Sequence, residues 1–158
     1  MSLYDDLKKI AEKNNQRMKT LVKASVISVG NDCIVRSPVG NPDLWLASDG
    51  DGGYVDFLSV RNIPDGYVGG SFRANWRFGS GAPDTTTIDS IDSNDSKSEL
   101  VKGMAKFSLG DTVHFTNSQP YANRLEYDGH STQAPKGIVR PAVQLFKTTV
   151  KQEAAKIK

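Results

Sequence analysis

Residues 3–29 read LYDDLKKIAEKNNQRMKTLVKASVISV, and this stretch sets the fold at the N-terminal end of the chain. Its apolar side chains recur at steps of three and four residues, and Asn14 breaks the series once, which is the pattern of an amphipathic helix. The recurring apolar positions after Leu3 are Leu7, Ile10, Met18, Leu21, Val22 and Val29. We therefore predict a long N-terminal helix.

Signals at both ends bound this helix. Ser2 is a candidate N-cap, and Asp5 and Asp6 lie in the first turn, where negative charge interacts favourably with the helix dipole. The sequence Gly30-Asn31-Asp32 predicts the end of the helix, because glycine is common just past helix C-termini. Cys33-Ile34-Val35 could add one more turn before Ser37-Pro38.

The middle of the chain predicts two strands. Residues 71–78 place Phe72, Ala74, Trp76 and Phe78 on one side and polar side chains on the other, the alternation of a half-buried strand. Residues 84–91, rich in threonine and isoleucine, form the second predicted strand. A hairpin through residues 79–83 would join the two.

The remaining elements follow from caps and periodicity. Ser96 and Glu99 have capping-box spacing ahead of an apolar series, which predicts a short middle helix, and residues 112–117 predict a third strand. A C-terminal amphipathic helix is predicted from Val139 to Ile157, with Pro141 in its first turn. The predicted fold is therefore α+β: a long N-terminal helix, a small antiparallel β-sheet, a short middle helix and a C-terminal helix.

A chain of 158 residues fits a single domain, which we assign to residues 1–158. Residues 41–68 are rich in Gly, Pro and Asp but also carry large apolar side chains, and they lack a helical period. We interpret them as an ordered loop insertion, because a connection of this length in a compact domain is usually functional or disordered and aromatic content argues against disorder.

Composition limits the possible functions. Twenty Lys and Arg against eighteen Asp and Glu leave a net charge of +2, which is weak for a protein that binds nucleic acid through counterion release. Apolar runs are too short for a membrane span, and we see no secretory signal, so we expect the protein to be made and kept in the cytoplasm. The single cysteine, Cys33, excludes an internal disulfide.

The sequence contains no recognisable catalytic motif. There are two histidines, His114 in a predicted strand and His130 in a predicted turn, and neither has a supporting nucleophile pattern. Residues 89–95 resemble a calcium loop in their acidity but lack its central glycine and terminal glutamate. We therefore expect no catalytic residues, no metal and no cofactor, and we predict that the chain is not an enzyme.

Two segments are more specific than their composition. Arg36-Ser37-Pro38-Val39-Gly40, followed after an interruption by Gly69-Gly70-Ser71-Phe72-Arg73-Ala74-Asn75-Trp76, resembles the pattern T/S-P-V-x-T-G-x-x-R-x-N-W of phage minor tail and tail-completion proteins of the lambda Z type. Residues 117–140, NSQPYANRLEYDGHSTQAPKGIVR, resemble that family's signature N-x-x-P-Y-A-x-x-L-E-Y-G-x-S-x-Q-A-P-x-G-M-V-R. Two departures are the roughly 28-residue insertion at 41–68 and the additional Asp128.

The resemblance implies a structural protein of a tailed bacteriophage virion, assembled in the host cytoplasm. It implies a ring, expected to hold six copies, at the head-proximal end of the tail, which completes the tail and joins it to the head connector while the genome DNA passes through the lumen. The tail tube, its terminator and the connector would be the partners. A tail terminator or a head-closure protein of the neck is the alternative within the virion.

Some motif residues are expected to set turns and the core, and others to contact neighbouring subunits, where Trp, Tyr and Arg dominate binding energy. The interface candidates are Arg73, Trp76, Tyr121, Arg124, Glu126, Tyr127 and Arg140. We expect Glu126 to meet an arginine such as Arg73 or Arg124, and the loop at 41–68 is a further candidate contact. A small nucleic-acid-binding protein using Lys8, Lys13, Arg17, Lys19 and Lys23 is the alternative from another class.

Overall fold

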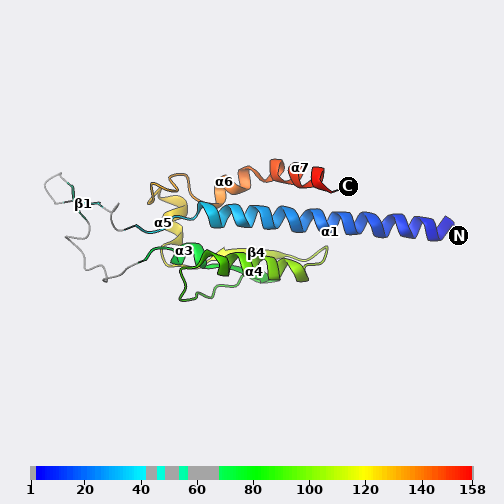
Figure 1. Ribbon diagram of the computed structural model, residues 1–158, viewed down its shortest axis with the longest axis horizontal. Coiled ribbons are helices and arrows are strands. Elements are labelled where there is room, and N and C mark those ends of the chain that lie inside the picture. Colours follow the sequence, from blue (N-terminus) through cyan, green and yellow to red (C-terminus); the bar gives the residue numbers. More distant parts are fainter. Residues whose placement is uncertain (1–2, 42–45, 49–53, 57–67, 158) are drawn as a thin grey trace.

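The computed structural model describes residues 3–41, 46–48, 54–56 and 68–157. A long helix, α1 (Leu3–Arg36), forms the axis of the molecule (Figure 1). Two C-terminal helices, α6 (Val139–Gln144) and α7 (Phe146–Lys156), pack along one side of it, and α3 (Ser71–Ala74) and α4 (Ser93–Lys106) pack along the other. The fold is α+β, as predicted.

Helix α1 continues through the extra turn at residues 33–35 and ends at Arg36. Gly30 does not end it, because this glycine serves packing instead: a Cβ placed there would lie 2.6 Å from Cδ2 of Leu100 on α4. The Ser37 hydroxyl closes the C-terminus by donating to the carbonyl of Cys33 at 2.7 Å. The proposed N-cap, Ser2, lies outside the described residues.

The main sheet pairs β3 (Trp76–Ser80) with β4 (Val113–Asn117) in antiparallel register, with Phe78 opposite Phe115. The predicted strand at 71–78 is therefore wrong in its first half, which is helix α3. Phe72 and Ala74 are buried on α3 and Trp76 is buried on β3, and Asn75 between the two elements is buried as well, so the apparent alternation is not that of one strand.

Residues 84–91 form no strand, and the predicted hairpin is wrong, because β3 pairs with β4. Two polar side chains hold this segment in an irregular path. Asp84 accepts hydrogen bonds from the backbone N–H and the hydroxyl of Thr86, and the Asn75 side chain pairs with both backbone groups of Ile88. These bonds occupy groups that a β-ladder would need.

Helix α4 begins at Ser93, three residues before the predicted capping box. Asp92 is the N-cap, and its side chain accepts the N–H of Asn94 at 2.8 Å. Ser96 is fully buried in the first turn, and its hydroxyl accepts the backbone N–H of Trp76 at 2.9 Å. Ser96, which the sequence predicted to cap the helix, therefore joins α4 to the sheet.

The predicted C-terminal helix is two helices, α6 and α7, joined at Leu145. Pro141 lies in the first turn of α6, as expected. A short helix, α5 (Ala122–Tyr127), precedes them. Within the insertion at 41–68, β1 (Leu46–Ser48) pairs antiparallel with β2 (Tyr54–Asp56), and most of the other insertion residues lie outside the described part of the chain.

The core has two parts that meet at Phe115 of β4. One part joins the end of α1 to α3, β3, α5 and α6, and the other joins the middle of α1 to α4. The buried members of the first are Cys33, Ile34, Phe72, Trp76, Leu125, Ala134, Ile138 and Ala142; those of the second are Leu100, Met104 and Phe107.

Candidate subunit interface

Trp76, the first interface candidate, lies in the core of its own chain and is 3% exposed. Its ring stacks on Phe115 at 5.1 Å between centroids and meets Phe72 edge-on at 6.0 Å. The indole N–H donates to the Ser37 hydroxyl at 2.8 Å, and that hydroxyl is itself bonded to α1. This position accounts for Trp76 without any neighbouring subunit.

Arg73 caps the C-terminus of α1. Its guanidinium donates to the carbonyl of Ser37 from Nε at 3.0 Å and from Nη2 at 2.5 Å, and to the carbonyl of Val35 at 3.0 Å. Carbonyls in the last turn of a helix lack partners within the helix, and a cation there is favoured by the dipole. Arg73 and Trp76 thus converge on Ser37 from different elements.

Glu126 performs the opposite function at the N-terminus of α6. Its carboxylate accepts the backbone N–H groups of Ile138 at 2.7 Å, Val139 at 2.9 Å and Arg140 at 3.1 Å. Partial burial raises the pKa of Glu126, but the hydrogen bonds from these three N–H groups and from the Arg140 side chain outweigh it, so the pKa is lowered from its ordinary value. Glu126 is the cap that α6 lacks within its own sequence.

Arg140 binds back to α5. Its Nε lies 3.2 Å from Oε1 of Glu126, and its Nη2 donates to the Glu126 backbone carbonyl. Its guanidinium carbon lies 5.3 Å from the centre of the Tyr127 ring. The prediction that Glu126 meets Arg73 or Arg124 is wrong, since Arg140 is its ion-pair partner, brought close by the chain reversal at residues 128–138.

Gly137 makes that reversal possible. Its φ is +83°, in the left-handed region, and a Cβ there would lie 2.5 Å from the carbonyl oxygen of Glu126. The Gln133 side chain bonds both backbone groups of Val39 and so ties the same loop to the segment after α1. The signature therefore encodes one connected unit in which α5 holds the start of α6.

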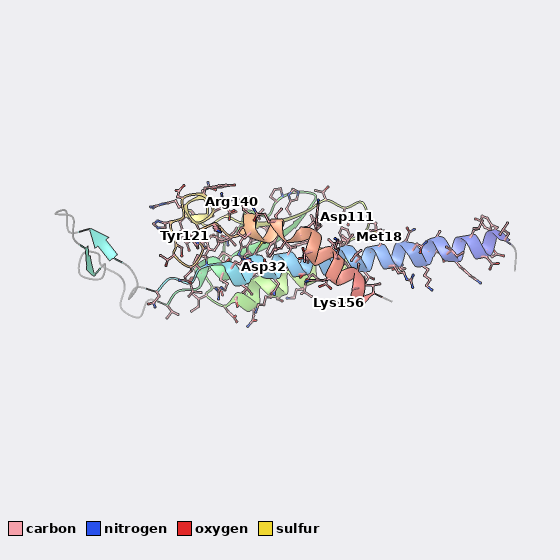
Figure 2. All side chains as sticks on the ribbon, turned by 90° about the horizontal axis from the view of Figure 1, so that it is seen from above. Met18, Asp32, Asp111, Tyr121, Arg140 and Lys156 are labelled. Carbon is pink, nitrogen blue, oxygen red and sulfur yellow. The ribbon has the colours of Figure 1, made fainter. Side chains whose placement is uncertain are left out.

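The outward side of this unit carries the other candidates. Tyr127 is 67% exposed, and the Arg140 side chain is about half exposed. Tyr121 precedes α5, and its ring centroid lies 5.7 Å from that of Phe72. The Tyr121 residue is 38% exposed. Arg124 lies 3.5 Å from Nδ1 of His130. Figure 2 shows Tyr121 and Arg140 at the end of the body away from the N-terminus of α1.

Three buried polar residues have structural roles that the sequence did not predict. Ser37 and Ser96 are buried hydroxyls that bond Trp76, and Asn75 is a buried amide that bonds Ser71 and Ile88. A signal existed for Asn75 and Ser37, since both lie within the quoted motifs. Serine on its own gives no indication of burial.

The described residues contain no group of three or more His, Cys, Asp and Glu side chains suited to a metal ion. Burial, with smaller contributions from Asp32 and Glu126, raises the pKa of the Cys33 thiol to about 12. A cavity of about 440 Å³ opens between α1, α4 and α7, and its lining includes none of the interface candidates. None of the helices in the described ranges is long and apolar enough to cross a membrane.

Comparison of the chain with protein-family models, curated proteins and solved structures finds no match. The resemblance to the tail-completion family therefore rests on the two quoted motifs alone.

Proposed function

We propose that this chain is a structural subunit of a tailed bacteriophage virion that forms a ring at the head-proximal end of the tail and joins the tail to the head connector. The observation that carries the proposal is the 117–140 segment, which resembles the family signature in order and spacing. Its members act together: Glu126, Gly137 and Arg140 lock α5 to α6, and Tyr127 remains on the surface beside Arg140.

The proposal assigns the exposed members of this unit to contacts with other subunits. Tyr127 and Arg140 form a surface cation–π pair, and aromatic and arginine side chains are enriched at the energetic centre of protein interfaces. Tyr121 and Arg124 extend the same surface along α5. Trp76 and Arg73 support this surface from inside the chain, through Ser37 and Phe72.

The nucleic-acid-binding alternative has less support from the placement of its basic residues. At about 100° per residue, Lys13 and Arg17 lie roughly 140–180° around α1 from Lys8, so the five basic side chains do not form one continuous face. Lys23 donates to the carbonyl of Ala105 in its own chain. A binding constant for DNA that falls steeply with salt would favour this alternative over the ring.

Deletion of the gene from the phage that carries it tests the proposed position. We expect filled heads and tails of normal length that fail to join, and joining should be restored when purified protein is added to the mixture. Overlong tails would identify a terminator instead, because only a terminator stops growth of the tube. Heads that lose their DNA would identify a head-closure protein, and normal infectious particles would contradict every virion role.

A further inference from the structure

The first half of α1 leaves the body of the molecule. Residues Leu3–Met18, which we name the N-terminal arm, are all exposed, and they extend beyond the other elements (Figure 1). Large apolar side chains are nevertheless present, with Leu3 77%, Leu7 56%, Ile10 57% and Met18 53% exposed. An isolated helix of about this length is only marginally stable in water, so the arm lacks the packing that usually holds such a helix.

These apolar residues share one face. At about 100° per residue, Leu3, Leu7, Ile10 and Met18 fall within an arc of roughly 80°, which we name the arm stripe. The same stripe continues into the body at Ser25, which is 2% exposed. The chain therefore covers this face in the body and leaves it uncovered in the arm.

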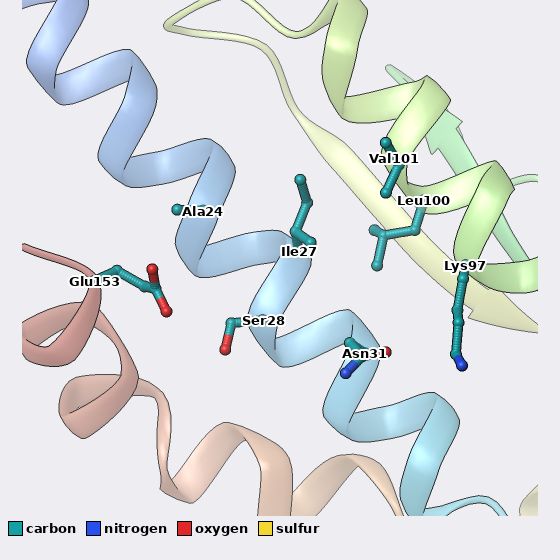
Figure 3. A pocket seen from close by; sticks show the side chains of 8 residues that line it. All are labelled: Ala24, Ile27, Ser28, Asn31, Lys97, Leu100, Val101 and Glu153. Atoms are coloured by element: carbon teal, nitrogen blue, oxygen red, sulfur yellow. The ribbon is translucent and has the colours of Figure 1, made fainter. Parts of the chain in front are cut away.

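A groove that fits such a stripe exists on the body. It lies between α1, α4 and α7, has a volume of about 440 Å³ and is lined by Ala24, Ile27, Ser28, Asn31, Lys97, Leu100, Val101 and Glu153. Figure 3 shows the α1 side chains between Val101 and Leu100 of α4 on one side and Glu153 of α7 on the other. Val101 is 53% exposed, so part of the apolar lining is accessible to a binding partner.

The arm cannot fill the groove of its own chain. Helix α1 runs without a break from the arm to the groove, and Ile10 and Ala24 are 14 positions apart, or about 21 Å along the axis. An arm that enters this groove therefore belongs to another copy of the chain.

The charges beside the stripe and beside the groove are complementary. Beside Leu7, Asp6 lies about 40° outside one edge of the stripe and Lys8 about 80° outside the other, as helical geometry places them, and Lys13 and Arg17 follow further along the arm on the Asp6 side. Lys97 and Glu153 lie at opposite sides of the groove (Figure 3), where Glu153 also pairs with Lys156 of its own chain at 2.7 Å. One orientation of a docked arm brings Asp6 to Lys97 and Lys8 to Glu153, and the reversed orientation opposes like charges.

We propose that the N-terminal arm of one copy inserts Leu7 and Ile10 into the groove between α1, α4 and α7 of the next copy. This inference rests on the proposed ring and names its contact. Each copy then gives an arm at one place and receives an arm at another, which is the heterologous kind of contact from which cyclic rings are built when the rotation between copies closes.

Disulfide trapping between two differently tagged chains tests the contact. One chain carries Leu7→Cys and the other carries Val101→Cys. The native Cys33 is buried and should form no disulfide. The two positions are too far apart to be linked within one chain. Disulfides need Cα atoms within about 7 Å, and Leu7 lies about 26 Å along α1 from the groove residue Ala24. We expect a cross-linked product that joins the two tags when the chains are mixed and oxidised.

A charge test measures the energetics. Leu7→Asp should raise the dissociation constant of the oligomer by about tenfold or more, as loss of a central interface residue does. Gln16→Asp is the matched control, because it adds the same charge on the opposite face of the arm and should leave the oligomer unchanged. Asp6→Lys should weaken the oligomer, and Lys97→Asp in the same chain should restore it. Circular dichroism verifies that each variant keeps its helices.

The outcomes separate this inference from the proposed function. A ring that survives Leu7→Asp and gives no cross-link between Leu7→Cys and Val101→Cys overturns the arm contact and leaves the ring intact. Cross-links only between two Leu7→Cys chains also overturn it, in favour of pairing between arms. A wild-type chain that stays monomeric at high concentration, with no cross-link of any kind, overturns both proposals.

Discussion

Replacing Glu126 by glutamine should remove the cap of α6 while changing almost no volume. The carboxylate accepts the N–H groups of Ile138, Val139 and Arg140 between 2.7 and 3.1 Å, and its side chain is only 12% exposed. Glutamine keeps one acceptor oxygen and turns an NH₂ donor toward N–H groups that are also donors, so at least one of the three bonds is lost.

The expected cost is about 2 kcal/mol in the free energy of unfolding. N-cap bonds contribute about 0.5–2 kcal/mol, and a charge at a partly buried helix N-terminus contributes up to about 2 kcal/mol, with overlap between the two. In a domain of this size that corresponds to a fall of about 4–8 °C in Tm. Urea unfolding followed by circular dichroism, with Tm from calorimetry, measures both quantities.

The pH dependence identifies the mechanism. The pKa of Glu126 is lowered in the folded chain, so its stabilisation is fully present above the ordinary value of 4.5 and is lost as the pH falls through the folded pKa. The difference between wild type and Glu126→Gln should therefore be constant from about pH 7 to pH 5 and should shrink at lower pH.

Glu12→Gln is the control for this comparison, because Glu12 is exposed on α1 and its loss should change stability by less than about 0.5 kcal/mol. The capping argument fails if Glu126→Gln matches wild type at neutral pH. It also fails if the loss of stability is the same at every pH, since a pure packing effect would not titrate.

Three further predictions concern the unit around Glu126 and the core. Gly137→Ala should cost about 1–3 kcal/mol, because its Cβ meets the Glu126 carbonyl, whereas Gly81→Ala, also at positive φ but with no atom within 4 Å, should cost less in the same urea assay. Trp76→Phe should lose about 1–3 kcal/mol through the missing bond to Ser37 and the smaller ring, and a cost near zero would contradict the assignment of Trp76 to the core. The Cys33 thiol, with its pKa raised to about 12, should react with a thiol reagent near pH 8 only after denaturant is added, and rapid labelling of the native chain would contradict its burial.

The sequence predicted helices and strands that have a sustained apolar pattern. It missed boundaries and segments whose conformation depends on individual contacts between distant residues. Helix α1 and strand β4 form where their apolar patterns predict them, although α1 buries residues only in its second half and β4 is partly buried throughout. Residues 71–78 were misassigned because an alternation over four positions fits one helical turn followed by a strand equally well. Glycine is common just past helix C-termini, but Gly30 lies within α1 and lets Leu100 approach it, a contact between residues 70 positions apart that local sequence cannot encode.

The sequence predicted an ion pair between Glu126 and an arginine, but not which arginine. Glu126 was expected to bind an arginine, and it does, but Arg140 reaches it through the turn at Gly137. Asp128, the residue added relative to the family pattern, ends α5 by donating its N–H to the Arg124 carbonyl, and Gly129 follows at φ +62°. The addition is absorbed at a helix end, where one extra residue changes no face of α5.

The division between buried and exposed motif residues determines which variants can test assembly. Trp76→Ala would empty the centre of the first core cluster and cost about 3–5 kcal/mol, so a failure of heads and tails to join would follow from misfolding as readily as from a lost contact. Tyr127→Ala and Leu7→Asp remove side chains that are more than half exposed, and the folded chain should keep its stability within about 0.5 kcal/mol. These two residues probe different neighbours in the proposed ring, because α5 lies beside the C-terminal end of α1 in Figure 1 and the arm is the N-terminal half of that helix. If Leu7→Asp alone prevents ring formation while Tyr127→Ala prevents only the joining of rings to heads or tails, the arm binds the neighbouring subunit and the signature surface binds the structure above or below it. Equal effects of both variants on ring formation would instead place the two surfaces in one subunit contact.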